Sequence, residues 1–582
     1  MKRQTLSGIL CAFIFAVAPL AARGQSKLDP GMLPKATAFY VAWHGAPSGD
    51  VRKTNSLLAL WDDPAFAPVR NAMFESMLQG STAPQKTTPA FSREELGEYA
   101  TLLDNEFVVG YIENPNAMKA TVSASGAHPR PWNGMFLVYD REGKEATIAK
   151  LLLRAQVSEK NAAKISTTTI AGIPVIKVEG AKSTTYWAED GKYALSASEP
   201  KVFEHIVGWT KHSANEAEAL GKTVAYHEAL DLLQGGILEF FVHFPSIQKT
   251  DWDTSAGGFR LRPLLQSLRL EAVHVIAGHL VLEGGRTRMQ GAILGEVKPG
   301  TLFDLWDEGT TTPASWQFIN FNTVSYQESR INFQGIYGLI RQAMQATAGA
   351  GQKNPMDMME VAAATRLGMP VPAALGLFSG EFASLQTSPT LDPHKQVYIL
   401  GIQNKPEVLK VLRGALAERV ASERAEGGTT FVKISEGGMA SSAGTAAWNY
   451  YYLGVTGDVI VASNHLESVR DTLAQRKSAA TENSQVPQTW QAVRAQFPAK
   501  IGGINFFDFQ KVDWAAAKER WTAEAGKAAA KANQKAAAKA DSNPFSKALK
   551  DLDPQVFSRH LHLSASAGWK DAQGVHFDGW IE

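Results

Sequence analysis

Apolar positions along this chain follow two different periods. Short runs rich in β-branched and aromatic residues predict strands, whereas apolar residues three and four positions apart predict helices. In the first half, strands are predicted at 38–43, 106–112, 135–139, 175–178, 184–187, 193–196, 237–244, 273–282 and 288–294. Helices are predicted at 54–61, 66–78, 148–155 and 201–209, and another ends near residue 103. Because hairpins and helices mix without regular β-α-β alternation, we expect an α+β fold with a largely antiparallel sheet.

Polar residues mark several boundaries of these elements. Thr54 or Asn55 can cap the helix that follows, and Ser92 with Glu95 has the spacing of a capping box. The dipeptide Asp190-Gly191 between two strand patterns predicts a tight hairpin.

One motif occurs twice, each time after a strand pattern. Gln248, Lys249, Asp251 and Trp252 recur in register as Gln510, Lys511, Asp513 and Trp514. The Asp-Trp pairs have two interpretations. The favoured one is structural: each aspartate caps the next segment and each tryptophan packs the strand exit. The alternative is a pair of pseudo-symmetric ligand sites at Asp251, Trp252, Asp513 and Trp514, with tryptophan stacking on a sugar ring.

The segments around this motif also recur in the same order. The second half has predicted strands at 316–321, 377–382, 397–400, 431–434, 450–453, 459–463, 501–507 and within 561–582, with a helix through Val408 and Leu412. We therefore expect two tandem homologous halves, each a largely antiparallel sheet with packed helices. Their bounds are 34–297 and 314–582, with linkers at 25–33 and 298–313.

An alanine- and lysine-rich stretch at 515–540 departs from this symmetry. Half of its residues are alanine, which predicts an exposed helical insert. Lys527, Lys531, Lys535 and Lys539 fall near one face, where they can meet anionic lipid or polysaccharide. A solvated helix is the favoured interpretation, because the opposite face offers no large apolar side chain.

The first 24 residues predict a secretory signal. Lys2 and Arg3 precede an apolar run at 8–20, and a small-x-small cleavage site follows at 22–24. Cleavage would remove three basic residues and no acidic one, taking the formal net charge from +1 to −2. Such a near-neutral chain argues against nucleic acid as a partner. No later apolar stretch is long enough to predict a transmembrane span.

The single cysteine, Cys11, lies inside the predicted signal. The mature chain would therefore have no disulfide and no thiolate metal site. A long exported chain without cysteine points to the periplasm or the extracellular medium of a bacterium.

The order of elements resembles a family of exported bacterial proteins, domain of unknown function 3352. The resemblance rests on the opening at Leu33-Pro34 and on the run ALWDDPAFAPV at 59–69. It covers most of the predicted mature chain and implies an exported, duplicated protein, with no catalytic residue or substrate to transfer.

No motif in the sequence predicts catalysis, a metal or a cofactor. His560 and His562 would share one face of a strand, but no third ligand lies nearby, so solvent-facing histidines are favoured. Ser379 lies near glycines without the spacing of a nucleophile elbow, and no phosphate-binding loop occurs. Acidic pairs occur at 62–63, 251/253 and 551/553, and solvated surface is their favoured interpretation.

The sequence favours a non-enzymatic binding or scaffolding protein of the cell envelope, with an envelope component or saccharide as the candidate partner. The alternative is a secreted hydrolase with a carboxylate-lined cleft between the two halves.

Overall fold

The computed structural model describes most of the chain. The described residues are 28–80, 97–98, 100–113, 134–150, 164–179, 184–212, 216–233, 235–248, 269–306, 313–347, 354–417, 419–435, 450–482, 487–531, 548 and 550–582. They form two compact units. Unit 1 comprises residues 1–63, 70–261 and 273–295, and unit 2 comprises 64–69, 262–272 and 296–582.

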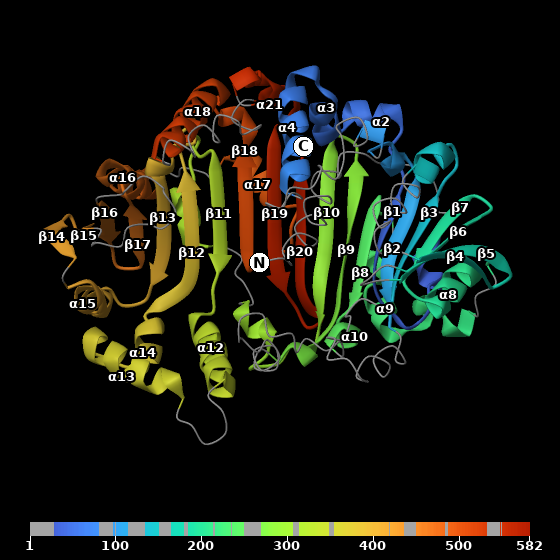
Figure 1. Ribbon diagram of the computed structural model, residues 1–582. Coiled ribbons are helices and arrows are strands. Elements are labelled where there is room, and N and C mark those ends of the chain that lie inside the picture. Colours follow the sequence, from blue (N-terminus) through green and yellow to red (C-terminus); the bar gives the residue numbers. More distant parts are fainter. Residues whose placement is uncertain are drawn as a thin grey trace. The chain divides into compact units, whose positions relative to one another are not determined.

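Among its described residues, unit 1 has ten strands, and every adjacent pair runs antiparallel. Figure 1 shows these strands side by side. Along the sheet their order is β4-β5-β6-β7-β3-β2-β1-β8-β9-β10. The strands are β1 (Thr37–His44), β2 (Glu106–Ile112), β3 (Met135–Asp140), β4 (Lys164–Ile170), β5 (Ile173–Glu179), β6 (Thr184–Asp190), β7 (Tyr193–Ala197), β8 (Leu238–His243), β9 (Val273–Glu283) and β10 (Arg286–Gly295).

Helix α8 (Pro200–Thr210) covers the core of unit 1. Its residues at spacings of three and four, Phe203, Ile206 and Val207, are buried with Tyr40 and Phe241 of the sheet. Tyr40 and Phe241 are partners across β1 and β8, and their rings stack with centroids 5.7 Å apart. Since large aromatic side chains bury the most apolar surface, this pair is a main stabilising contact of unit 1.

The part of unit 2 that the structure describes also has ten strands in antiparallel pairs. Their order is β14-β15-β16-β17-β13-β12-β11-β18-β19-β20. The strands are β11 (Ser325–Arg330), β12 (Phe378–Gln386), β13 (Gln396–Ile402), β14 (Val420–Glu426), β15 (Thr429–Ser435), β16 (Tyr450–Val455), β17 (Val459–Ser463), β18 (Gly503–Asp508), β19 (Leu563–Lys570) and β20 (Gly574–Ile581).

The core of unit 2 lies between this sheet and two helices, α16 (Leu466–Glu482) and α17 (Gln488–Arg494). Trp490 of α17 is fully buried and meets Tyr326 of β11 and Phe506 of β18 edge to face. Tyr326 and Phe506 are partners across their strands. The other helices of unit 2 are α12 (Phe333–Thr347), α13 (Pro355–Leu367), α14 (Val371–Leu375), α15 (Lys405–Leu416), α18 (Trp514–Lys531) and α21 (Gln555–His560).

Most of the predicted strands are confirmed, and so are a predicted helix cap and a predicted hairpin turn. The antiparallel α+β class is as expected. The side chain of Asn55 caps α3 (Ser56–Asp62) by accepting from the amide of Leu58. Gly191 takes the positive φ of 58° that the turn between β6 and β7 requires. The predicted box at Ser92 and Glu95 lies outside the described residues.

Two predicted strand positions are wrong. Residues 316–321 are not the opening strand of unit 2, because Ala314–Phe318 forms the 3-10 helix η9 and the strand begins at Ser325. The aromatic residues Trp316 and Phe318 mimic a strand pattern but fill the core from a helical turn. His560 is likewise no strand residue, since it ends α21, so His560 and His562 share no strand face.

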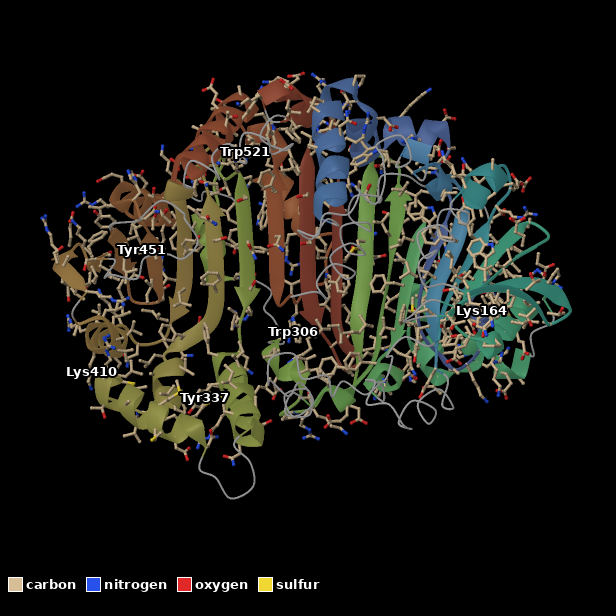
Figure 2. The ribbon with its side chains drawn as sticks, viewed as in Figure 1. Lys164, Trp306, Tyr337, Lys410, Tyr451 and Trp521 are labelled. Atoms are coloured by element: carbon tan, nitrogen blue, oxygen red, sulfur yellow. The ribbon has the colours of Figure 1, made fainter. Side chains whose placement is uncertain are left out.

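The first part of the predicted insert is a helix that packs into the core of unit 2. Residues 514–531 form α18 as expected from their composition, but its first turns do not project freely. Ala517 is fully buried, and Trp521 packs with Trp514. Figure 2 labels Trp521 on this helix. The side chains of the four lysines of the stripe lie outside the described residues.

Candidate functional site

A cavity of about 600 Å³ lies in unit 2, at the ends of its central strands. It is bounded by one face of α16 and by the connections that flank β11, β12 and β13. Four lining residues are apolar, namely Phe321, Val324, Pro389 and Val397. The remaining lining residues are polar or charged: Asn322, Thr387, Ser388, Lys395, His465, Ser468, Asp471, Thr472, Gln475 and Lys511. Its volume falls in the range of about 300–1,000 Å³ typical of small-molecule sites.

Helix α16 supplies one wall of this cavity. Ser468, Asp471 and Gln475 are three and four residues apart, so their side chains share a helix face. Buried Val469 and Leu473 hold the helix against the core of unit 2. The wall is thus a polar stripe on a helix whose apolar stripe is buried.

A tight turn forms part of the rim. The amide of Thr323 donates to the carbonyl of Asn320 at 3.1 Å, and the amide of Asn322 donates to Asn320 Oδ1 at 2.8 Å. Phe321 stands at the apex of this turn and is 77% exposed. A single exposed apolar side chain is common on protein surfaces, and Phe321 is distinguished by its position among the residues that line the cavity.

Lys511 of the repeated motif lines the cavity. Its Nζ donates to the carbonyl oxygen of Thr323 at 3.2 Å and lies 3.5 Å from the carboxylate of Asp508. The lysine therefore joins β18 to the rim turn, and Asp508 balances its charge.

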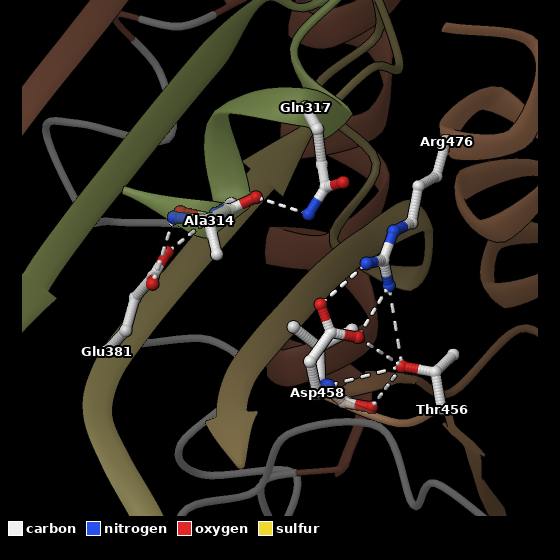
Figure 3. A network of polar contacts seen from close by, with 8 residues as sticks. Ala314, Gln317, Glu381, Thr456, Asp458 and Arg476 are labelled. Atoms are coloured by element: carbon white, nitrogen blue, oxygen red, sulfur yellow. Dashed lines mark hydrogen bonds and ion pairs between the residues drawn. The ribbon is translucent and has the colours of Figure 1, made fainter. Parts of the chain in front are cut away.

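A network of polar contacts positions η9 and α16 (Figure 3). The carboxylate of Glu381 accepts hydrogen bonds from the amides of Ala314 and Ser315, which begin η9. Arg476 of α16 donates to both carboxylate oxygens of Asp458, at 2.8 and 2.6 Å. The hydrogen bond from Arg476 holds the pKa of Asp458 below its usual value. These bonds fix the two elements that carry the rim turn and the polar wall.

In the copy of the Asp-Trp motif that the structure describes, both residues have structural roles. Asp513 Oδ1 accepts from the amide of Ala516 at 3.0 Å and so caps α18, as the favoured interpretation predicted. Trp514 is 6% exposed, packs against Phe557 at a tilt with ring centroids 4.5 Å apart, and donates to the carbonyl of Phe509. Neither residue lines the cavity. Asp251 and Trp252 lie outside the described residues.

The sequence missed two buried ionisable clusters. In unit 1, His44 Nδ1 lies 3.3 Å from Glu106 Oε1, and its Nε2 lies 3.5 Å from Glu239 Oε1. Burial lowers the pKa of His44, but the two carboxylates outweigh it and raise the pKa to about 9. In unit 2, Glu328 is 1% exposed and both of its carboxylate oxygens lack a hydrogen bond. Burial and then the charge of Glu381 raise the pKa of Glu328 to about 8. No spacing signal marks these residues, because strand pairing brings them together.

A second, smaller cavity of about 480 Å³ lies near the opposite ends of β11 and β12. Trp306, Phe333 and Lys570 are among its lining residues. The Nζ of Lys570 already donates to the carbonyl of Trp306 at 2.6 Å. The lysine thus serves to hold the wall of this cavity.

Within the described part of the chain, no three His, Cys, Asp or Glu side chains are grouped to hold a metal ion. The helices that are described include none with the length and hydropathy of a membrane span. The chain matches no family model, no curated protein and no solved structure.

Proposed function

We propose that this protein binds a polar ligand in the unit 2 cavity without converting it. The observation that carries the proposal is the lining of the cavity, which combines many hydrogen-bonding groups with a single carboxylate, that of Asp471. Hydrolysis of a glycosidic bond ordinarily requires two carboxyl groups facing each other. A binding site requires only complementary polar groups and a rigid frame.

One contact favours a hydrolase as the second candidate. His465 Nδ1 lies 3.3 Å from Ser468 Oγ, and both side chains line the cavity. A nucleophilic serine also needs a group that orients its histidine. Among the described residues, the only contact of the His465 ring is the one from Nδ1 to Ser468, and no group holds its Nε2. A contact three residues apart at a helix start is also typical of capping, so binding remains the better supported function.

We also propose that the two units arose by tandem duplication. In support, the strand order in unit 1 becomes that of unit 2 when each strand number is raised by ten. The pair of Tyr40 with Phe241 then corresponds to that of Tyr326 with Phe506. Superposing the two units tests this proposal and should place these two pairs over one another. Unrelated strand connections would refute the duplication.

The proposed setting is the bacterial cell envelope or medium. The predicted signal at residues 1–24 and the resemblance to domain of unknown function 3352 support export. N-terminal sequencing of exported protein should find a start near Gln25. A retained signal, or a lipid on Cys11, would contradict this assignment.

Binding can be tested by blocking the cavity. Ser468→Trp would fill it from α16, and Ala474→Trp is a matched control because Ala474 is exposed on the same helix and does not line the cavity. A panel of saccharides, amino acids, dicarboxylates and nucleotides would be screened by thermal shift. At least one class should raise the Tm of the wild type and of Ala474→Trp, but not that of Ser468→Trp. No shift with any class, a shift that survives in Ser468→Trp, or turnover of the compound would refute the proposal.

A further inference from the structure

We infer that the unit 2 cavity is a site for a neutral saccharide, with Phe321 as the platform on which a sugar ring stacks. This inference rests on the proposed binding function and names the chemical class of its ligand. It follows from the rim turn, the charge balance of the lining and one buried amide oxygen.

Phe321 has the properties of a stacking platform. Its turn is held by backbone bonds and by the side chain of Asn320, so the ring is presented at little entropic cost. A pyranose ring has an apolar face of C–H groups, which packs favourably on an aromatic ring. Stacking would remove from water a phenyl ring that is now 77% exposed.

The charges in the cavity nearly cancel. Lys511 is already engaged by Asp508 and by the carbonyl of Thr323. The exposed residues Lys395 and Asp471 also line the cavity and contribute one charge of each sign. An anion would be repelled by the carboxylate, and a cation would be repelled by the lysines. A neutral polyhydroxylated ligand can use both kinds of group as hydrogen-bond partners.

Gln475 supplies an acceptor that lacks a partner. Its Oε1 is buried and has no hydrogen-bond partner among the described residues, although Gln475 lines the cavity. A buried oxygen without a hydrogen bond is unfavourable, so rotation of the amide toward a donor in the cavity is favourable. A sugar hydroxyl is such a donor, and His465, Ser468 and Asn322 offer further partners.

The test uses the full mature chain and isothermal titration with three neutral trisaccharides, namely chitotriose, maltotriose and cellotriose. At least one should bind, and Phe321→Ala should weaken its Kd about tenfold, as expected for loss of a stacked ring. Phe321→Trp should retain binding, and Gln475→Met should weaken it. Tyr398→Ala is the matched control, because Tyr398 is another exposed aromatic residue and does not line the cavity. It should leave the Kd unchanged.

Salt and charge discriminate between ligand classes. Binding of a neutral sugar should change less than about twofold between low and high salt, because screening acts on charges. Tighter binding of trigalacturonate than of every neutral trisaccharide would overturn the inference, and so would an unchanged Kd in Phe321→Ala. If no saccharide binds but another class shifts the Tm in a Ser468-dependent way, the inference fails and the binding function stands.

Discussion

At the scale of single residues, the two units hold buried charge in opposite ways. His44, at the end of β1, donates from both ring nitrogens to carboxylates and is stabilised as a cation. Glu328, on β11, is buried within the influence of the charges of Glu381, Arg330 and Arg494, and it accepts no hydrogen bond from the described residues. In the pairing of the strands, Arg330 stands opposite Glu381 as His44 stands opposite Glu106. The position therefore carries a cation in both units, and the unpaired Glu328 is an additional source of pH dependence in unit 2.

Glu328→Gln should make unfolding less dependent on pH. The folded carboxyl has a pKa of about 8, against 4.5 as the usual value, so the unfolded state binds fewer protons between these pH values. The free energy of unfolding of the wild type should therefore fall as pH rises from 4.5 to 8. Glutamine cannot ionise, and the variant should be more stable than the wild type at pH 8 by on the order of 2 kcal/mol. Urea unfolding from pH 5 to 8 would measure this, with exposed Glu467→Gln as control. If the free energy of unfolding changed with pH equally in the variant and the wild type, the prediction would be contradicted.

His44→Gln should also remove a fall in stability with rising pH, but it should do so by destabilising the protein at low pH. The folded pKa of about 9 exceeds the usual 6.5, so the stabilisation is fully present below pH 6.5 and is lost as pH rises through 9. Removing the cation leaves Glu106 and Glu239 buried without it, which should cost about 3 kcal/mol at pH 6. The cost should shrink above pH 9, and His44→Arg should restore stability at high pH.

Urea unfolding between pH 6 and 10 would check this prediction. His274→Gln is the control, because His274 is partly exposed and its contact with Glu228 is long, at 3.8 Å. A loss in His44→Gln that is equal at every pH would mean that the ring contributes only packing.

At the scale of elements, the sequence pattern predicts strands whose side chains are buried and misses strands whose side chains are exposed. Strands such as β2 and β8 have apolar runs because the core selects them. Strand β14, with the sequence VASERAE, is nearly all exposed, and β4 is rich in threonine with most side chains exposed. Neither was predicted, because they form by pairing with neighbouring strands and have little buried surface.

The candidate site was predictable only in part. The repeat directed attention to Lys511, which lines the cavity, but the more conspicuous Trp514 of the same motif is core. Ser468, Asp471 and Gln475 have a spacing shared by any polar helix face. The cavity exists because connections distant in sequence meet α16, and single-sequence patterns carry no information on such contacts.

Trp521→Ala should destabilise unit 2. The ring lies against the aromatic group formed by Trp514, Phe509 and Phe557, with centroids of Trp514 and Trp521 6.3 Å apart. It is only partly buried, so we expect a loss of about 1–2 kcal/mol in the free energy of unfolding. Chemical denaturation would measure it. Glu519→Ala, an exposed position on the same helix, should change stability much less.

The later part of the predicted insert should be dispensable. Its alanine and lysine composition gives helix propensity but offers almost no large apolar side chain to the core. Replacing residues 526–538 with a short Gly/Ser linker should leave the Tm nearly unchanged. A fall above about 5 °C would indicate core packing. Unchanged stability with loss of binding to anionic vesicles or polysaccharide would instead make the lysine stripe a functional surface.

At the scale of the whole molecule, each unit has its own buried aromatic centre. Tyr40 and Phe241 lie in the core cluster of unit 1, and Tyr326 and Phe506 lie in that of unit 2. The clusters share no residue. Since mutational effects add when sites have no common partners, the two centres should respond independently.

Phe241→Ala and Phe506→Ala are therefore a matched pair of substitutions. Each removes a buried phenyl ring from the strand that pairs with the tyrosine of its unit, and each should cost about 3–5 kcal/mol. The double variant should lose the sum of the two costs to within about 0.5 kcal/mol. Guanidinium unfolding followed by circular dichroism would measure all three variants. A coupling well above that value would show that the two cores stabilise one another, and the picture of two separately packed units would then fail.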